Sequence, residues 1–156
     1  MSRVLLDTHA FLWFVFRDRR LSKKAARTIS ATGTTKMLSM ASVWEIVIKT
    51  QLGKLGLGMG IEEFLDRYVS GRQIEVLPIE LPDLVAYSSL PMHHSDPFDR
   101  LLIAQSQLED AYLATGDPQF LPYDVDIVWS AAGKPPSALH GRPRRRWGRR
   151  KSAGAK

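Results

Sequence analysis

The sequence predicts a single three-layer α/β domain, in which helices cover both faces of a central parallel sheet of about five strands. Two observations lead to this fold class. Short apolar runs typical of buried strands alternate with longer segments of helical periodicity. Glycine, proline and N-cap residues separate these segments. The length of 156 residues, without internal repeats, is that of one domain.

The first third of the chain supplies two strands and three helices. Residues 4–6 (VLL) are expected to form a short buried strand, and the apolar residues 10–15 a buried helix. A serine N-cap opens the next helix, over residues 22–29, and a glycine follows its end. Residues 36–40 form the second expected strand, and residues 42–52 the helix after it.

The middle of the chain begins with a glycine-rich segment. Residues 52–60 (LGKLGLGMG) are expected to be a loop with exposed apolar side chains, and residues 61–70 an amphipathic helix closed by a glycine. Residues 74–77 form the third expected strand, and Pro82 opens another helix.

The last third contains the longest periodic segment. Asp96 is a natural N-cap for a helix over residues 97–109, with proline at its first position. Residues 112–115 and 126–129 supply the fourth and fifth strands. Alternating strands and helices of these lengths specify the parallel sheet.

The formal charge of +6 comes from the C-terminal segment. Residues 1–139 hold 14 Lys and Arg against 16 Asp and Glu, whereas residues 140–156 hold 8 Lys and Arg and no acid. We therefore expect a folded domain over residues 1–133 and a basic, disordered tail over residues 134–156. Such a tail either is solvated without a specific role or binds nucleic acid through its charge. The side chains that would bind phosphate are Arg142, Arg144, Arg145, Arg146, Arg149, Arg150 and Lys151.

Two absences bound the location of the protein. The chain has no cysteine, which excludes disulfides and thiolate metal sites and is compatible with the cytoplasm. The N-terminal apolar run is short and is interrupted by Asp7 and His9, so we expect neither a signal peptide nor a membrane span.

Four acidic residues are expected at one edge of the sheet. Asp7 and Asp117 follow the first and fourth strands, and Glu45 and Asp99 lie near the starts of the helices that begin at that edge. Each has a structural explanation when taken alone. Asp7 suits an N-cap, Asp117 precedes a proline and suits a turn, and Asp99 lies near the positive end of a helix dipole.

Glu45 has the strongest structural explanation of the four. Ser42 and Glu45 have the spacing of a capping box, and Glu45 and Lys49 that of a favourable i,i+4 pair. Four unrelated structural roles would not explain why all four acids are expected at the same edge of the sheet, whereas a single functional site would. Converging carboxylates repel one another unless cations neutralise them, and oxygen ligands suit Mg²⁺ or Mn²⁺. Such ions activate water and stabilise the leaving oxygen in phosphoryl displacement.

The segments that contain these acids also resemble a known family. LLDTHAFLW, SVWEIVIKTQLGKL, LPMHHSDPFDRLLIAQ and LATGD look like the PIN-domain ribonucleases, most closely the VapC toxins of bacterial toxin-antitoxin pairs. The resemblance covers about residues 3–130 in the same order. At residue 116 this chain has a glycine where many relatives carry a bulkier or basic residue.

The resemblance implies a PIN-like fold and a Mg²⁺- or Mn²⁺-dependent endoribonuclease that acts as a toxin. It implies a metal site, which we expect to be catalytic, at Asp7, Glu45, Asp99 and Asp117. The hydroxyls that would support this site are those of Thr8 and Thr115, and Asp96 is either a cap or a secondary ligand. The implied partners are an RNA substrate and a cognate small antitoxin, in a homodimer or a toxin-antitoxin hetero-oligomer in the cytoplasm, with no membrane.

Two other functions remain open from the residues alone. In a Mg²⁺-dependent phosphatase Asp7 would attack phosphorus, but a second carboxylate is expected two residues on, where His9 stands. A non-catalytic nucleic-acid-binding module would use the basic tail and would not need four acids at one edge.

Several nearby residues allow two interpretations. His93 and His94 either touch a phosphate or, the favoured interpretation, are exposed or bonded locally. Arg100 pairs with a carboxylate or meets an RNA phosphate.

Apolar residues also allow two interpretations. Phe11, Trp13 and Trp44 are expected mainly in the core. The alternative is that part of the face they share forms a groove for a partner protein. The side chains that would complete such a groove are Leu55, Leu57 and Met59.

Overall fold

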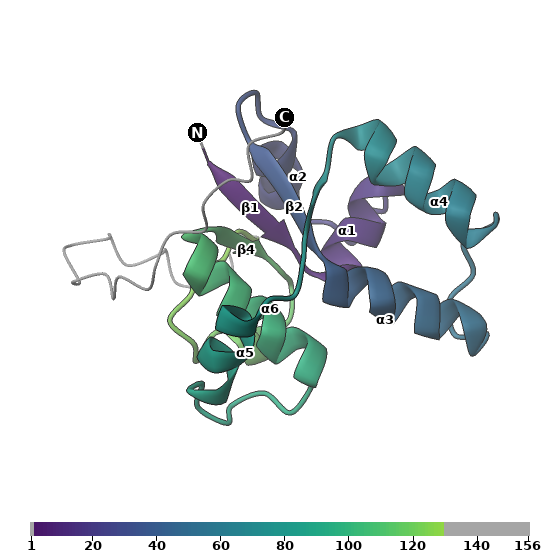
Figure 1. The fold of residues 1–156 in the computed structure, drawn as a ribbon. Helices are drawn as coiled ribbons and strands as arrows, with labels where there is room; N and C mark the ends of the chain where they lie inside the picture. The colour runs from purple at the N-terminus through teal and green to yellow at the C-terminus, as the bar shows by residue number, and fades with distance from the viewer. Residues whose placement is uncertain (1, 130–156) are drawn as a thin grey trace, which may run out of the picture.

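The computed structural model describes residues 2–129, and Figure 1 shows a sheet with helices on both sides. Four parallel strands are hydrogen-bonded in the order β3-β2-β1-β4. Their bounds are β1 Arg3–Leu6, β2 Thr35–Ser39, β3 Glu75–Leu77 and β4 Tyr112–Ala114. The helices are α1 Thr8–Val15, α2 Lys23–Ser30, α3 Met40–Gln51, α4 Ile61–Tyr68, α5 Leu81–Ser88 and α6 Pro97–Glu109, with 3-10 turns η1 Ser70–Arg72 and η2 Pro118–Phe120.

The central strand β1 is apolar on both faces. Val4, Leu5 and Leu6 are fully buried. Val4 and Leu6 pack into one core and Leu5 into a second, on the opposite face of the sheet. A parallel strand covered by helices on both sides has no solvent-facing side, which explains its uninterrupted apolar sequence.

The two cores join different helices to the sheet. Phe11, Ile29, Ile46 and Phe64, one each from α1, α2, α3 and α4, belong to the first core. The second core contains Leu102 of α6, and α5 lies beside α6 (Figure 1). These layers confirm the predicted three-layer α/β domain.

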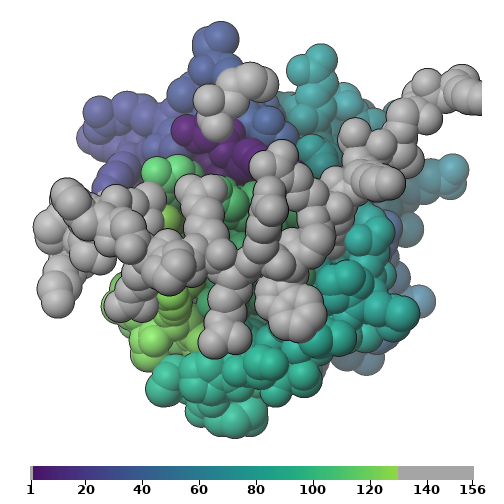
Figure 2. All heavy atoms as spheres, turned by 60° about the vertical axis from the view of Figure 1, so that its left-hand side comes forward, coloured from purple at the N-terminus to yellow at the C-terminus, as the bar shows by residue number. Residues whose placement is uncertain are grey.

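The fifth expected strand, residues 126–129, is reduced to a single bridge beside β4. Leu113 N donates to Asp126 O at 2.8 Å, and Val128 N donates to Leu113 O at 2.9 Å. Figure 2 shows this side of the molecule, where the N-terminal strand in purple lies next to the green segment that contains β4. The expected sheet of about five strands is therefore four strands and one bridge.

Helix α3 begins earlier than predicted. The Ser39 hydroxyl caps it by accepting from Ala41 N at 3.1 Å, because β2 passes into the helix without a loop. Ser42 lies inside the helix and is 1% exposed, so the predicted capping box of Ser42 and Glu45 is wrong.

The expected exposed loop over residues 52–60 is largely packed. Leu57 is 5% exposed and belongs to the first core, and Leu55 and Met59 are partly buried against it. Only Leu52, at 62%, is strongly exposed among these apolar side chains. The segment joins α3 to α4, and its apolar side chains pack against the core that these two helices share.

The three aromatic residues expected mainly in the core differ in burial. Phe11 is fully buried and Trp13 is half-buried, as predicted, but Trp44 is 58% exposed on α3. It contacts the Phe98 ring at the start of α6, with ring centroids 5.5 Å apart. The α3 face that carries Trp44 is therefore turned to solvent, not to the sheet.

The predicted basic tail, residues 134–156, and the predicted domain end at residue 133 lie outside the described residues. Within residues 2–129, none of the helices combines the length and hydropathy of a bilayer span.

Candidate functional site

The register of the sheet brings the first and last of the four predicted acids together. Leu6 of β1 pairs with Ala114 of β4, so Asp7 and Thr115 follow at the same level, and Asp7 N donates to Ala114 O at 3.1 Å. Asp117 lies two residues further on, and its backbone N–H is held by Thr115 Oγ1 at 3.1 Å. Parallel strands thus deliver both carboxylates to one edge of the sheet.

Asp7 is both a helix cap and a member of this edge. Its Oδ1 accepts from Ala10 N at 2.6 Å, and the Thr115 hydroxyl also bonds its carboxylate. The side chain is 5% exposed, and this burial raises the pKa of Asp7, against the opposing effect of the two hydrogen bonds. The capping role and the site role therefore coincide in one residue.

Asp99 is a second carboxyl group at this edge whose pKa is raised. Its pKa is raised to about 8, first by burial and then by the charges of Asp96, Asp7, Glu45 and Asp117, in that order of importance. Like charges act over short distances in a partly buried site. The other three predicted acids and Asp96 thus lie within electrostatic reach of Asp99.

Asp96 is a cap, as one of its two interpretations predicted. Its Oδ1 accepts from Phe98 N at 2.8 Å and from Asp99 N at 3.4 Å. Pro97 occupies the first helical position, where a missing N–H costs nothing. The cap fixes the first turn of α6 and so fixes Asp99.

Glu45 is already engaged through both carboxylate oxygens. Thr8 Oγ1 donates to Oε2 at 2.5 Å, and Lys49 Nζ lies 2.7 Å from Oε1. The predicted i,i+4 pair is confirmed, and Thr8 is the hydroxyl that orients Glu45.

His94 is a candidate site residue that sequence reasoning placed only in part. It is bonded locally, as the favoured interpretation allowed, but it is only 4% exposed, and its Nε2 lies 3.2 Å from both Asp99 Oδ2 and Asp117 Oδ2. Its Nδ1 accepts from Asp96 N at 3.1 Å. The proton of the neutral ring is therefore on Nε2, where it bridges the two carboxylates.

The loop that carries His94 is fixed by a distant tyrosine. The Tyr123 hydroxyl donates to Pro91 O at 2.9 Å and accepts from His93 N at 3.1 Å and His94 N at 2.8 Å. Arg100 Nη1 lies 3.3 Å from the same hydroxyl. The adjacency of two histidines to an acidic helix was the only sequence signal for this arrangement.

Arg100 has neither of its two predicted partners. It is 3% exposed and donates to Pro91 O at 2.8 Å and Leu90 O at 3.3 Å, with its guanidinium 4.8 Å from the centre of the Tyr87 ring. Carbonyl oxygens, which point inward from the loop, replace the expected carboxylate or phosphate. Arg100 supports the loop and does not face the acids.

Tyr123→Phe is expected to lower the free energy of unfolding by about 1–3 kcal/mol, because it leaves several buried polar groups without their partner. Thermal or urea unfolding measures the loss. Tyr112→Phe is the matched control, since no hydrogen bond of the Tyr112 hydroxyl is found within residues 2–129. Equal stability of the two variants would show that the hydroxyl does not hold the loop.

The donor set fits a hard divalent cation. Carboxylate oxygens converge from Asp7, Glu45, Asp99 and Asp117, and crowding of this kind is relieved by a cation. The tightest group is His94, Asp99 and Asp117, whose potential ligand atoms lie within 4.8 Å of one another. Coordination by His94 would require loss of its Nε2 proton, so the oxygens are the more direct ligands.

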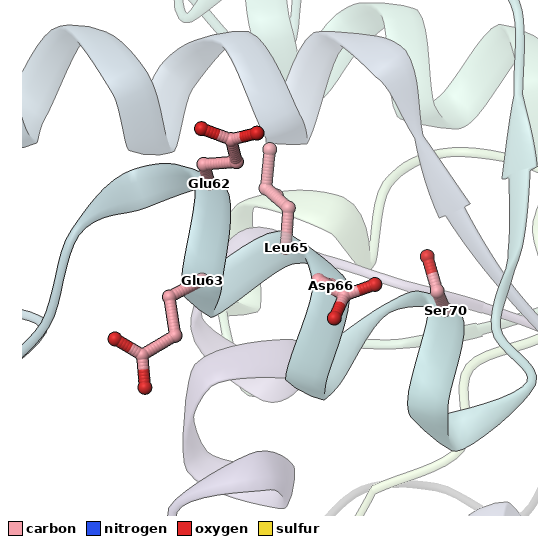
Figure 3. A pocket seen from close by; sticks show the side chains of 5 residues that line it. All are labelled: Glu62, Glu63, Leu65, Asp66 and Ser70. Atoms are coloured by element: carbon pink, nitrogen blue, oxygen red, sulfur yellow. The ribbon is translucent and has the colours of Figure 1, made fainter.

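A hollow on α4 shares no lining residue with this site. It is lined by Glu62, Glu63, Leu65, Asp66 and Ser70. Figure 3 shows the three carboxylates directed away from one another. Glu63 also pairs with Arg67 at 2.7 Å, so these acids do not form a common ligand set.

Comparison with known proteins agrees with this fold. A model of the PIN domain family matches residues 4–125, whereas no curated protein matches the chain. The chain is similar in structure to a chain of VapBC2 from Rickettsia felis bound to a promoter DNA fragment, with a TM-score of 0.63, 16% identity, and coverage of 83% of this chain and 100% of that one.

Two further solved structures are similar at comparable levels. One is a toxin-antitoxin complex from Klebsiella pneumoniae, with a TM-score of 0.54, 17% identity, and coverage of 75% of this chain and 89% of that one. The other is VapBC-1 from nontypeable Haemophilus influenzae, with a TM-score of 0.57, 15% identity, and coverage of 81% and 96%. Identities this low show a common fold only. The family match spans most of the chain, and the chain therefore belongs to the PIN domain family.

Proposed function

We propose that this chain is a divalent-metal-dependent endoribonuclease of the VapC type, the toxin of a toxin-antitoxin pair. The observation that carries the proposal is the convergence of Asp7, Glu45, Asp96 and Asp117 on Asp99 at one edge of a PIN domain. We also propose that the protein acts in the cytoplasm, because its proposed substrate is RNA and because the chain has no cysteine for disulfides.

The proposed ligands of Mg²⁺ or Mn²⁺ are Asp7, Glu45, Asp99 and Asp117. When bound, the ion would lower the pKa of a water molecule and neutralise charge on the scissile phosphate. Thr115 holds Asp7 and the backbone of Asp117, and Thr8 holds Glu45. His94 Nε2 lies within hydrogen-bond distance of both Asp99 and Asp117, which holds these two carboxylates together.

The geometry favours hydrolysis assisted by a metal over the phosphatase alternative. A nucleophilic Asp7 would need a free oxygen and an acid two residues on, whereas Asp7 is 5% exposed, caps α1, and is followed at that spacing by His9. Five carboxylates held close together repel one another, which costs folding free energy. A non-catalytic nucleic-acid-binding module would not explain why the fold accepts this repulsion.

The proposed partner is a small antitoxin protein. One of the similar solved structures is a toxin-antitoxin complex, and this chain would form a comparable hetero-oligomer or a homodimer. Exposed apolar side chains on α3, among them Met40 at 44% and Trp44 at 58%, offer surface that a partner would cover.

Cleavage of a structured RNA with and without EDTA tests the activity. Cleavage that requires Mg²⁺ or Mn²⁺ and stops with EDTA supports the nuclease. Binding without cleavage in either metal would support the non-catalytic module, and release of phosphate from a phosphomonoester would support the phosphatase.

The basic tail is proposed to add affinity for RNA without taking part in the chemistry. A chain that ends at Leu139 is expected to bind RNA more weakly at low salt, with a slope of log affinity against log salt that is flatter by roughly 2 to 3.5. Binding by an Asp99→Asn chain, full-length and shortened, at about 50 to 300 mM salt measures this slope. Overlapping slopes would show that residues 140–156 do not bind RNA.

A further inference from the structure

A hollow with aromatic walls opens beside the acid cluster. Asp7 and Asp117 line it together with Trp13, Trp129 and Arg20. Its volume is about 540 Å³, within the range of roughly 300–1,000 Å³ usual for ligand sites. Because the same two carboxylates belong to the hollow and to the proposed metal site, a ligand in one lies next to the other.

The two tryptophans form a continuous wall. The ring centroids of Trp13 and Trp129 are 5.9 Å apart, and the ring of His9 lies 5.7 Å from that of Trp13. Both tryptophans are only half-buried, although each contacts the first core. Packing in the core therefore leaves part of both rings open to the hollow.

Gly116 is the residue that allows Trp129 to lie there. A Cβ at position 116 would lie 2.6 Å from two carbons of the Trp129 ring, closer than any real contact. A side chain at this position would displace the indole from the backbone next to Asp117. Gly116 is therefore required because a side chain there would clash with the Trp129 ring, and not because of its backbone conformation.

Arg20 adds a positive charge to the wall. Its guanidinium carbon lies 5.1 Å from the centre of the Trp13 ring, a cation–π contact. Asp18 orients it through bonds to Nε at 3.0 Å and Nη2 at 2.7 Å. The Arg20 side chain is 68% exposed, so a surface pair of this kind does not stop it from meeting a phosphate.

We propose that this hollow binds one unstacked base of single-stranded RNA, next to the phosphate that the proposed cation would hold at the acids, with Arg20 facing a neighbouring phosphate. Aromatic faces and guanidinium groups are the groups that proteins use for splayed bases. The carboxylates of Asp7 and Asp117 in the lining disfavour a free anion and favour a polymer whose phosphate would be shared with the proposed cation. The inference rests on the proposed function, because it assumes an RNA substrate.

The test measures binding without cleavage, in the full-length Asp99→Asn chain with a short oligoadenylate. An abasic nucleotide is moved along the oligomer one position at a time. One position is expected to weaken binding by about 5- to 100-fold, which is the value of one base stacked on an aromatic side chain. Trp129→Leu and Gly116→Ala, each added to Asp99→Asn, are expected to weaken the intact oligomer by a similar factor and to abolish the effect of the abasic position.

Arg20→Ala is expected to weaken binding severalfold and to reduce the salt dependence by about one phosphate, a slope change of about 0.7. Arg19→Ala is the matched control, since Arg19 is an exposed neighbour that does not line the hollow. Melting curves show whether each variant folds.

A crosslink in the unsubstituted chain keeps the inference testable if Trp129→Leu unfolds. A 4-thiouridine at the sensitive position is expected to crosslink to a peptide that contains Trp13 or Trp129. A flat abasic scan, unchanged affinity in the folded variants, or crosslinks confined to other segments would overturn the inference. If the parent still cleaves RNA in a metal-dependent manner, only the base site fails; binding that depends on Trp129 without any cleavage would instead overturn the nuclease.

Discussion

Asp7→Asn or Asp99→Asn is expected to lower RNA cleavage by at least two orders of magnitude, on the order of 3 kcal/mol in activation free energy. Asparagine keeps the size of the side chain and removes the charge that would hold the cation. Asp7 Oδ1 also caps α1 through Ala10, and an asparagine oxygen preserves that bond. The loss should therefore appear in single-turnover cleavage with Mg²⁺ while the fold persists.

Asp66→Asn is the matched control for this prediction. Asp66 is an exposed acid on α4, remote from the edge that carries Asp7. Its substitution is expected to leave the cleavage rate within about twofold, a change of roughly 0.4 kcal/mol. Parental activity in Asp99→Asn would show that the acid cluster is not the catalytic site.

Asp99→Asn is expected to stabilise the metal-free protein, and more so as the pH rises. The folded-state pKa of Asp99 is about 8, above its ordinary value of 3.8. Between about pH 4 and pH 8 the carboxyl group of Asp99 is protonated in the folded protein and ionised in the unfolded chain. The free energy of unfolding therefore falls as the pH rises through this range. The variant lacks this loss, so its advantage should grow between these values and then level off, at roughly 2–5 kcal/mol.

Thermal unfolding in EDTA at several pH values measures this effect. At pH 8 the variant should melt several degrees above the parent, and near pH 4 the two should coincide. Mg²⁺ or Mn²⁺ should raise the melting temperature of the parent and change that of the variant little, because the cation binds the folded state through the missing charge. A constant difference at every pH would mean that Asp99 does not ionise against its neighbours.

The fold was predictable because its signals are local. The apolar sequence of β1, the N-cap at Asp96 and the proline after it each depend on a few adjacent residues. Errors arose where one element passes directly into the next. Ser39 caps α3 at the end of β2, a junction that no turn residue marks.

The candidate site divides in the same way. Asp7, Asp99 and Asp117 occupy ends of strands and starts of helices, and parallel topology alone brings such positions to one edge. The place of His94 depends on Tyr123, which follows it by 29 residues and bonds its backbone. Sequence patterns carry no signal for such a contact.

The sequence by itself determined the fold class, the acidic residues and the edge at which they meet, because periodicity and chain order specify all three. Only the tertiary structure decided how these acids are supported. In the folded protein His94 is buried between two carboxylates, Arg100 is buried and bonds the carbonyl of Pro91, and the Trp129 ring packs against Gly116. The physical reason is that burial and hydrogen bonding between distant segments arise only when the two cores have packed.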